Sequence, residues 1–270
     1  EMEVTAFISG TGSGNIRACY GEVIQLVSGG GTDYVWKPAT YLDDPYSATP
    51  LANPIESIVY VVTVSGACGI TDSTSVTIER FPPLEAKFTI DTTSGCSPLE
   101  VTFHDQSFGV REYYWDFGDG SPVDYWLSQD TVTSDTTFTH TFYNTTNDPT
   151  DTAQTYEIEL LIKNINDCTD TLRRYVTVFP EVTANFDLID MADTIGCHPL
   201  TLDFRNQSNN EDYYLWEFGD GGSSGNENPT HTFDNFGTID SVYSVELVTT
   251  SSYFCRDTAW QDITVHSYLE

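Results

Sequence analysis

The sequence predicts an all-β chain that folds as three tandem β-sandwiches, arranged one after another in an elongated rod. Short segments rich in Val, Thr, Tyr and Phe alternate apolar and polar residues, as strands with one buried face do. No stretch keeps the 3.6-residue apolar period of an amphipathic helix over three turns. One aromatic motif also occurs twice, about a domain length apart, which indicates repeated modules.

The repeated motif reads YYWDFGDG at residues 113–120 and YYLWEFGDG at residues 213–221. Other pairs follow in the same order around it: GCSPLEVTF and GCHPLTLDF (95–103 and 196–204), THTF twice (139–142 and 230–233), and CTDT and CRDT (168–171 and 255–258). The spacing between copies changes only between these segments. Length changes of this kind are typical of loops, so the shared segments are predicted to be strands.

Proline-containing segments divide the chain at Arg80-Phe81-Pro82-Pro83 and at Phe179-Pro180. Proline cannot continue a strand ladder, so each segment ends a strand and stiffens a junction. The predicted domains are therefore residues 1–82, 83–180 and 181–270. Because the linkers are only a few residues long, the domains are expected to stack end to end.

The charge of the chain excludes several classes of partner. It has 10 Lys and Arg against 41 Asp and Glu, a formal net charge of −31. Such a surface repels phosphate backbones and anionic lipids, so no nucleic-acid binding is expected. No apolar run reaches the ~18 residues of a membrane span, so no membrane insertion by this segment is expected either.

The aromatic motif is expected to be structural. Alternation along a strand points Trp115 and Phe117 into a core, and Gly118-Asp119-Gly120 forms a tight turn that a Cβ would strain. The second copy supplies the same roles through Trp216, Phe218, Gly219, Asp220 and Gly221. The alternative is a site for carbohydrate stacking or for a cation, made by the outward Tyr and Asp side chains.

No catalytic set is apparent, so we expect no enzyme activity. His140 and His231 occupy equivalent places in the two THTF segments and are expected to be structural. The chain has no serine-hydrolase elbow, no zinc-protease helix and no phosphate loop. None of the histidines lies at metal-ligand spacing from another His or a Cys: His104, His140, His198, His231 and His266.

The ordered motifs resemble the PKD (polycystic kidney disease) domain family over residues 84–266, as two full modules. The first unit lacks the aromatic motif. Through ACYGEVIQL (18–26) and YVWKPA (34–39) it resembles the immunoglobulin-like modules beside PKD repeats in very large surface proteins of gliding Bacteroidota. The resemblance implies a seven-stranded, immunoglobulin-like β-sandwich for each unit, and a role in adhesion or spacing.

The resemblance also raises the question of Ca²⁺, because some PKD modules bind it with an acidic loop before the Trp strand. Ca²⁺ needs six to eight oxygen ligands. The candidates here are Asp105, Asp119 and Asp220. The loop after Asp105, however, consists mostly of uncharged residues and also contains Arg111. No other cofactor is expected.

Six cysteines without a C-x-x-C pair predict disulfides and an oxidising compartment. Each unit has one cysteine before its second strand and another in its last hairpin. Pairing within units would give Cys19–Cys68, Cys96–Cys168 and Cys197–Cys255. In an immunoglobulin-like sandwich, however, these two places lie at opposite ends, about 20 Å apart, whereas a disulfide needs Cα atoms within roughly 7 Å.

A head-to-tail rod offers the other solution, in which Cys19–Cys168 and Cys96–Cys255 join successive domains. Cys68 and Cys197 would then pair with neighbouring domains of a larger parent protein. Both connectivities remain open at this point.

The leading functional hypothesis is a non-catalytic structural or adhesive segment of a large exported adhesin of the gliding-motility type, on the bacterial cell surface and attached through its parent to the outer membrane. It would project a binding tip, or bind polysaccharide or other surface ligands weakly and many times over. The alternative is an accessory region of a secreted hydrolase, a protease or chitinase, whose catalytic domain lies outside this chain.

Overall fold

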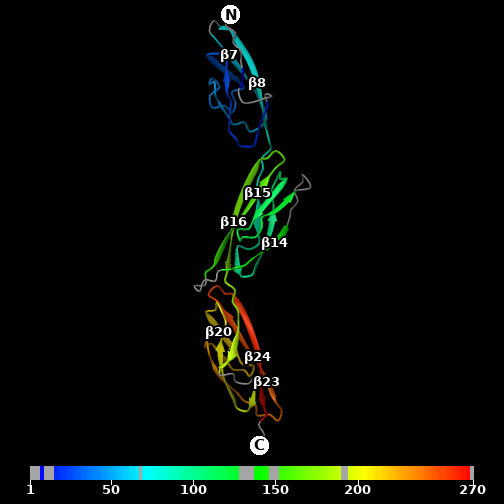
Figure 1. Cartoon of the computed structure of the whole chain (residues 1–270), viewed down its shortest axis with the longest axis vertical. Helices are drawn as coiled ribbons and strands as arrows, with labels where there is room; N and C mark the ends of the chain where they lie inside the picture. The colour runs from blue at the N-terminus through cyan, green and yellow to red at the C-terminus, as the bar shows by residue number, and fades with distance from the viewer. Residues whose placement is uncertain are drawn as a thin grey trace.

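The structure is a computed structural model, and it describes residues 7–8, 15–66, 69–127, 137–145, 152–189 and 194–267. Three β-sandwich modules lie in line, with the two chain ends at opposite ends of the molecule (Figure 1). Strands β1–β8 form the first module, β9–β16 the second and β17–β24 the third. The predicted all-β rod is confirmed. Among the described residues, no helix is long and apolar enough to cross a membrane.

The second module packs a five-stranded sheet, in the order β10-β16-β15-β12-β13, on a three-stranded sheet, β14-β11-β9. Its strands are β9 (Phe88–Ile90), β10 (Ser94–Cys96), β11 (Leu99–Asp105), β12 (Glu112–Asp116), β13 (Asp124–Leu127), β14 (Thr137–Phe142), β15 (Gln154–Lys163) and β16 (Thr169–Phe179). Alternate residues of both sheets meet in one core, with Phe103 and Phe142 facing Trp115, Ile158 and Val176. This is the packing that strict apolar alternation dictates.

The third module repeats this plan with sheets β18-β24-β23-β20-β21 and β17-β19-β22. Its strands are β17 (Phe186–Leu188), β18 (Ile195–Cys197), β19 (Leu200–Asn206), β20 (Tyr213–Glu217), β21 (Ser223–Ser224), β22 (Thr230–Phe233), β23 (Ser241–Thr250) and β24 (Arg256–His266). In both modules the longest strands form the last hairpin, which runs the length of the module: β15–β16 in the second and β23–β24 in the third.

The first module has one four-stranded sheet, β2-β8-β7-β5, and two small two-stranded sheets, β3-β6 and β1-β4. Trp36 and Tyr60 are fully buried in its core. Its strands are β1 (Phe7–Ile8), β2 (Asn15–Ala18), β3 (Ile24–Gln25), β4 (Ser28–Gly29), β5 (Asp33–Lys37), β6 (Leu51–Ala52), β7 (Ile58–Ser65) and β8 (Thr71–Arg80).

The family resemblance implies seven strands for each module, whereas the described residues form eight strands in the second module and eight in the third. The extra strand arises where the first segment of the module changes sheets. Strand β9 pairs antiparallel with β11, and the chain then crosses so that β10 pairs in parallel with β16. Strands β17 and β18 divide in the same way. This crossing brings Cys96 and Cys197 to the end of the module at which the chain leaves it.

Candidate functional site

The two copies of the aromatic motif lie in the cores of their modules. Trp115 and Trp216 have no exposed surface, and Phe117 and Phe218 are almost as deeply buried. Trp115 contacts Phe88 edge-on, with ring centroids 4.9 Å apart, and Trp216 contacts Phe186 at 5.0 Å in the same way. Edge-to-face contacts of this kind add to the stabilisation from burial. The motif therefore anchors the core.

The first glycine of each turn is required by close backbone packing. Gly118 has φ +71°, and a Cβ there would lie 2.4 Å from the carbonyl oxygen of Glu157. Gly219 has φ +80°, and its Cβ would lie 2.7 Å from the carbonyl oxygen of Ser244. Only glycine combines this conformation with this approach. The turn therefore sits directly against the hairpin strand β15 or β23.

The aspartate of each turn binds the histidine of the THTF strand. Asp119 Oδ2 lies 2.7 Å from His140 Nε2, and the His140 ring stacks on Phe117 with centroids 3.9 Å apart. The third module repeats this arrangement. Asp220 Oδ2 lies 2.7 Å from His231 Nε2, and the His231 ring stacks on Phe218 with centroids 3.9 Å apart. These contacts fix the turn to the opposite sheet, so both histidines are structural components of the module.

Hydrogen bonding lowers the pKa of both aspartates. Burial alone would raise the pKa of Asp119, but hydrogen bonds from Ser121 and His140 outweigh burial and hold it below its ordinary value of 3.8. Burial acts in the same direction on Asp220, and hydrogen bonds from His231 and Gly222 lower its pKa. Both groups are therefore ionised at neutral pH.

The three Ca²⁺ candidates do not converge. Asp119 and Asp220 are bound to histidines in separate modules, and Asp105 is buried, with Oδ1 accepting from the hydroxyl of Ser107 at 2.6 Å. Burial and the neighbouring Asp105 carboxylate raise the pKa of Tyr113 to about 12. Across the described ranges, no group of three or more His, Cys, Asp or Glu side chains could hold a metal ion.

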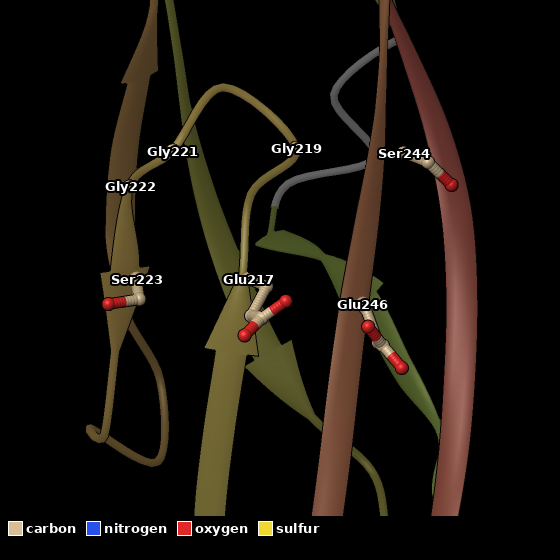
Figure 2. Close-up of a pocket in the computed structure, with 7 residues that line it drawn as sticks. All are labelled: Glu217, Gly219, Gly221, Gly222, Ser223, Ser244 and Glu246. Carbon is tan, nitrogen blue, oxygen red and sulfur yellow. The ribbon is translucent and has the colours of Figure 1, made fainter.

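One polar hollow of about 340 Å³ lies on the outer face of the third module, between the glycine turn and the hairpin strand. Glu217 and Glu246 lie side by side on β20 and β23, with Gly219, Gly221 and Gly222 above them, Ser223 to the left and Ser244 above Glu246 (Figure 2). The hollow was not predicted, because its glutamates come from strands that are far apart in the sequence.

Each junction between modules carries a disulfide. Cys19 is bonded to Cys168, and Cys96 is bonded to Cys255, with Cα atoms 5.7 Å apart in both pairs. The interdomain connectivity is therefore the one present, and the intradomain pairs Cys96–Cys168 and Cys197–Cys255 are absent. Cys197 is exposed and has a free thiol. Cys68 lies outside the described residues, so its predicted pairing stays a prediction.

The hairpin tip that presents each cysteine has the same geometry at both junctions. At the first, the side chain of Asn164 accepts from the backbone N–H of Cys168 at 3.1 Å, and Asp167 has φ +66°. At the second, the Ser251 hydroxyl accepts from the N–H of Cys255 at 3.2 Å, and Phe254 has φ +65°. The tip therefore holds its cysteine rigidly toward the preceding module.

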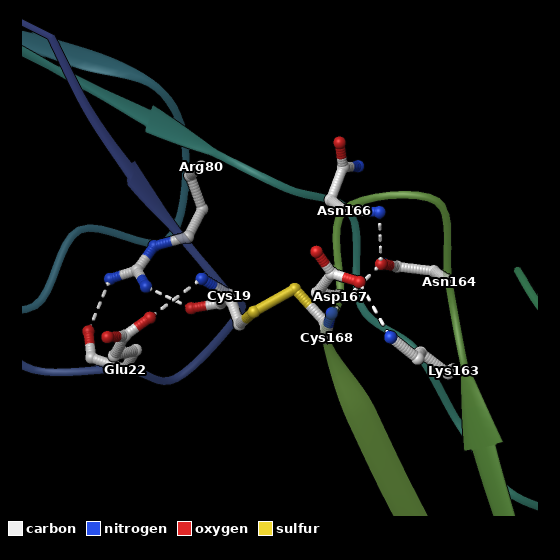
Figure 3. The surroundings of a disulfide bond; sticks show 8 residues. All are labelled: Cys19, Glu22, Arg80, Lys163, Asn164, Asn166, Asp167 and Cys168. Carbon is white, nitrogen blue, oxygen red and sulfur yellow. Dashed lines mark hydrogen bonds and ion pairs between the residues drawn. A yellow bond between two sulfur atoms is a disulfide. The ribbon is translucent and has the colours of Figure 1, made fainter.

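A buried arginine organises the first junction (Figure 3). Arg80 is 7% exposed, and its guanidinium donates to the carbonyl oxygens of Pro54 at 2.6 Å, of Glu22 at 2.8 Å and of Cys19. These bonds hold the segment after β2, and with it Cys19, against the end of β8. Such a network suits guanidinium, which has several donors in a fixed plane.

The second junction uses aromatic packing at the corresponding place. The ring of Phe179, at the end of β16, stacks on Tyr253 of the third module with centroids 4.6 Å apart and planes 9° apart. Val178 occupies the strand position equivalent to Arg80 and is fully buried. The covalent link is thus the same at both junctions, while the surrounding contacts differ.

The linkers are tied to the same hairpins that carry the disulfides. The backbone N–H of Ala86 donates to Asp170, two residues after Cys168, at 2.8 Å. The N–H of Ala184 donates to Asp257, two residues after Cys255, at the same distance. Chain and disulfide therefore enter each following module at one place, which restricts rotation about the junction.

Comparison with known proteins gives a family match for part of the chain. A PKD domain family model matches residues 187–265. No curated protein matches the chain. Among solved structures, the PKD1 domain of the Vibrio cholerae metalloprotease PrtV is 28% identical over 32% of this chain and 99% of its own, with a TM-score of 0.26. Mouse cadherin-23 EC22-24 is 11% identical over 98% of this chain and 99% of its own, with a TM-score of 0.31.

Both TM-scores lie below 0.5, so the family match is the comparison that bears on this chain. PKD and immunoglobulin-like domains are generally non-catalytic, extracellular modules of structural or adhesive type. The match, the repeated motif and the sandwich fold together describe tandem PKD-like and immunoglobulin-like modules.

Proposed function

We propose that this chain is a tension-bearing spacer within a large exported adhesin of the bacterial cell surface, of the gliding-motility type. Its neighbours would be further domains of the parent protein, and the parent would be attached to the outer membrane. The module boundaries we propose are residues 82/83 and 180/181. The observation that carries the proposal is the double covalent connection at each junction, by the linker and by an interdomain disulfide.

The two disulfide loops overlap, which shortens the covalent path through the molecule. Cys96 lies inside the loop closed by Cys19–Cys168, and Cys168 lies inside the loop closed by Cys96–Cys255. A direct covalent route from end to end therefore runs through residues 1–19, 96–168 and 255–270. Most of the first and third modules lie off this route and cannot lengthen the rod, even when they unfold.

The second module is held at both ends of one strand. Cys168 directly precedes β16, and β16 ends at Phe179, which pairs in parallel with Cys96. Tension from the first disulfide therefore passes along β16 to the second disulfide, through the hydrogen bonds between β10 and β16. This arrangement loads those bonds along the strand direction, so they must break together.

The chain's acidity and exposed outer faces support a further adhesive part of the proposal, with polysaccharide or other surface ligands as weak, repeated partners. Export to an oxidising compartment is supported by the disulfides.

Single-molecule pulling of the full chain between its ends tests the spacer role. With disulfides intact, we expect the final extension to match the residues of the direct route, at roughly 3.5 Å per residue. With reductant present, the extension should grow to that of the whole chain. The double variant Cys19→Ser with Cys168→Ser should extend only slightly further than the intact chain, because Cys96–Cys255 still bypasses residues 97–254. Equal extensions with and without reductant would contradict the proposal.

A further inference from the structure

The outer face of the third module places two carboxylates opposite each other. Glu217 and Glu246 pair in register on neighbouring strands. Like charges at such positions repel each other and destabilise a sheet. Both line the hollow of about 340 Å³ described above (Figure 2). Within the described part of the chain, neither forms an ion pair.

The second module shows what the same place can hold. Asp116 and Glu159 are the equivalent register pair. Arg173, on the next strand, contacts one member of this pair, with its guanidinium 2.5 Å from Glu159, and it also lies 3.4 Å from Glu157. A guanidinium of the chain itself therefore binds one carboxylate of the acidic pair in this module.

The third module has Trp260 at the position of Arg173. Trp260 pairs in register with Glu246, as Arg173 pairs with Glu159, and it is 64% exposed. Residues 181–270 contain two arginines and no lysine. Arg205 is engaged by Asp187 at 2.8 Å, and Arg256 pairs with Thr250, about 13 Å along the strand from Trp260.

We propose that Glu217, Glu246 and Trp260 bind the guanidinium of an arginine side chain from a partner polypeptide. The two carboxylates accept its N–H groups, and the exposed indole next to Glu246 offers a face for cation–π stacking. Guanidinium fits better than ammonium, because it is planar and both forks onto carboxylates and stacks on aromatic rings. It fits better than Ca²⁺, which needs more oxygen ligands than the pair supplies. This inference goes beyond the spacer role and does not depend on it.

The test is an NMR titration of the ¹⁵N-labelled full chain with the end-blocked tripeptide Gly-Arg-Gly. We expect saturable shifts of the backbone signals of Gly219–Ser223, Ser244 and Glu246 and of the Trp260 indole, with half-saturation on the order of 1 mM. The lysine tripeptide should bind several-fold more weakly, and the glutamate tripeptide should leave the signals unchanged. Shifts that do not saturate would overturn the proposal. Saturation by Ca²⁺ without a response to the arginine peptide would overturn it in favour of a metal site.

Two matched exchanges separate the site from its surroundings. Trp260→Arg supplies the guanidinium from within the chain and should weaken peptide binding at least tenfold. Arg173→Trp removes the internal cation of the second module and should create a second set of saturable shifts at Asp116 and Glu159. Both positions are on the surface, and thermal unfolding confirms that each variant is folded. Unchanged binding in Trp260→Arg, or no second site in Arg173→Trp, would overturn the proposal.

Discussion

In the second module Asp119 holds His140 against Phe117. In the third, Asp220 holds His231 against Phe218, and the Asp–His hydrogen-bond distance and the His–Phe centroid distance are the same in both modules. The outer faces of the same sheets differ. Arg173 binds Glu159 in one module, and the exposed Trp260 occupies the equivalent strand position in the other. The interior contacts define the module, and the outer face can change without disturbing them. Differences in binding between modules should therefore lie on the outer face.

The largest effect is expected from the two core tryptophans. Trp115→Ala and Trp216→Ala each remove a fully buried ring, so each should cost its module about 3–5 kcal/mol of unfolding free energy. Because the two rings are equally buried and make the same edge-on contact with a phenylalanine, the two losses should be similar. Thermal unfolding by circular dichroism measures the loss, and non-reducing proteolysis with mass mapping shows which module has opened. Tyr213→Ala, at an exposed position on β20, is the control and should change stability little. Clearly unequal losses of unfolding free energy would show that the two tryptophans do not contribute equally to the cores of their modules.

The next effect comes from the turn aspartates. Asp119→Asn and Asp220→Asn each replace a charged hydrogen bond to a histidine, at an expected cost of about 1–3 kcal/mol at neutral pH. The folded-state pKa of each aspartate lies below its ordinary value of 3.8. Each carboxylate therefore stabilises its module above that value, and the stabilisation is lost as the pH falls through the folded-state pKa.

Denaturant unfolding between pH 7 and pH 2 checks this prediction. The gap in stability between the wild type and each Asn variant should be constant at neutral pH and should close below about pH 4. Glu85→Gln is a matched change of charge outside these hydrogen bonds. A gap that stays constant down to pH 2 would show that the aspartates do not act through their charge.

Much of this fold could be predicted from the sequence, because alternation and repetition are local signals. The sandwich class, the order of modules and the core roles of Trp115 and Trp216 depend on these signals. The sequence predicts the interdomain disulfides as one of two possible connectivities. Strand length places the two cysteines of one module at opposite ends of its sandwich, which disfavours a bond between them. Choosing between the two connectivities required the positions of neighbouring modules.

The role of Arg80 was missed, although the signal was present. Along β8, Val76 and Ile78 point inward, and the same alternation points Arg80 inward. The Pro-Pro sequence that follows indicates the end of a strand but not a buried cation. The stack of Phe179 on Tyr253 and the pair of Glu217 with Glu246 had no local signal, because each joins segments brought together only by the tertiary fold.

The smallest effect should come from the outer faces, where the modules differ. Arg173→Ala removes an exposed ion pair, whose contribution to stability is small and is screened by salt. Trp260→Ala removes an exposed ring that covers no core, so its loss should be smaller still. In low salt, urea unfolding should therefore show a small loss for Arg173→Ala and none for Trp260→Ala, and the first loss should vanish in 1 M NaCl. If Trp260→Ala lost as much unfolding free energy as a core substitution, the indole would stabilise the third module itself, and its exposure would not indicate a binding role.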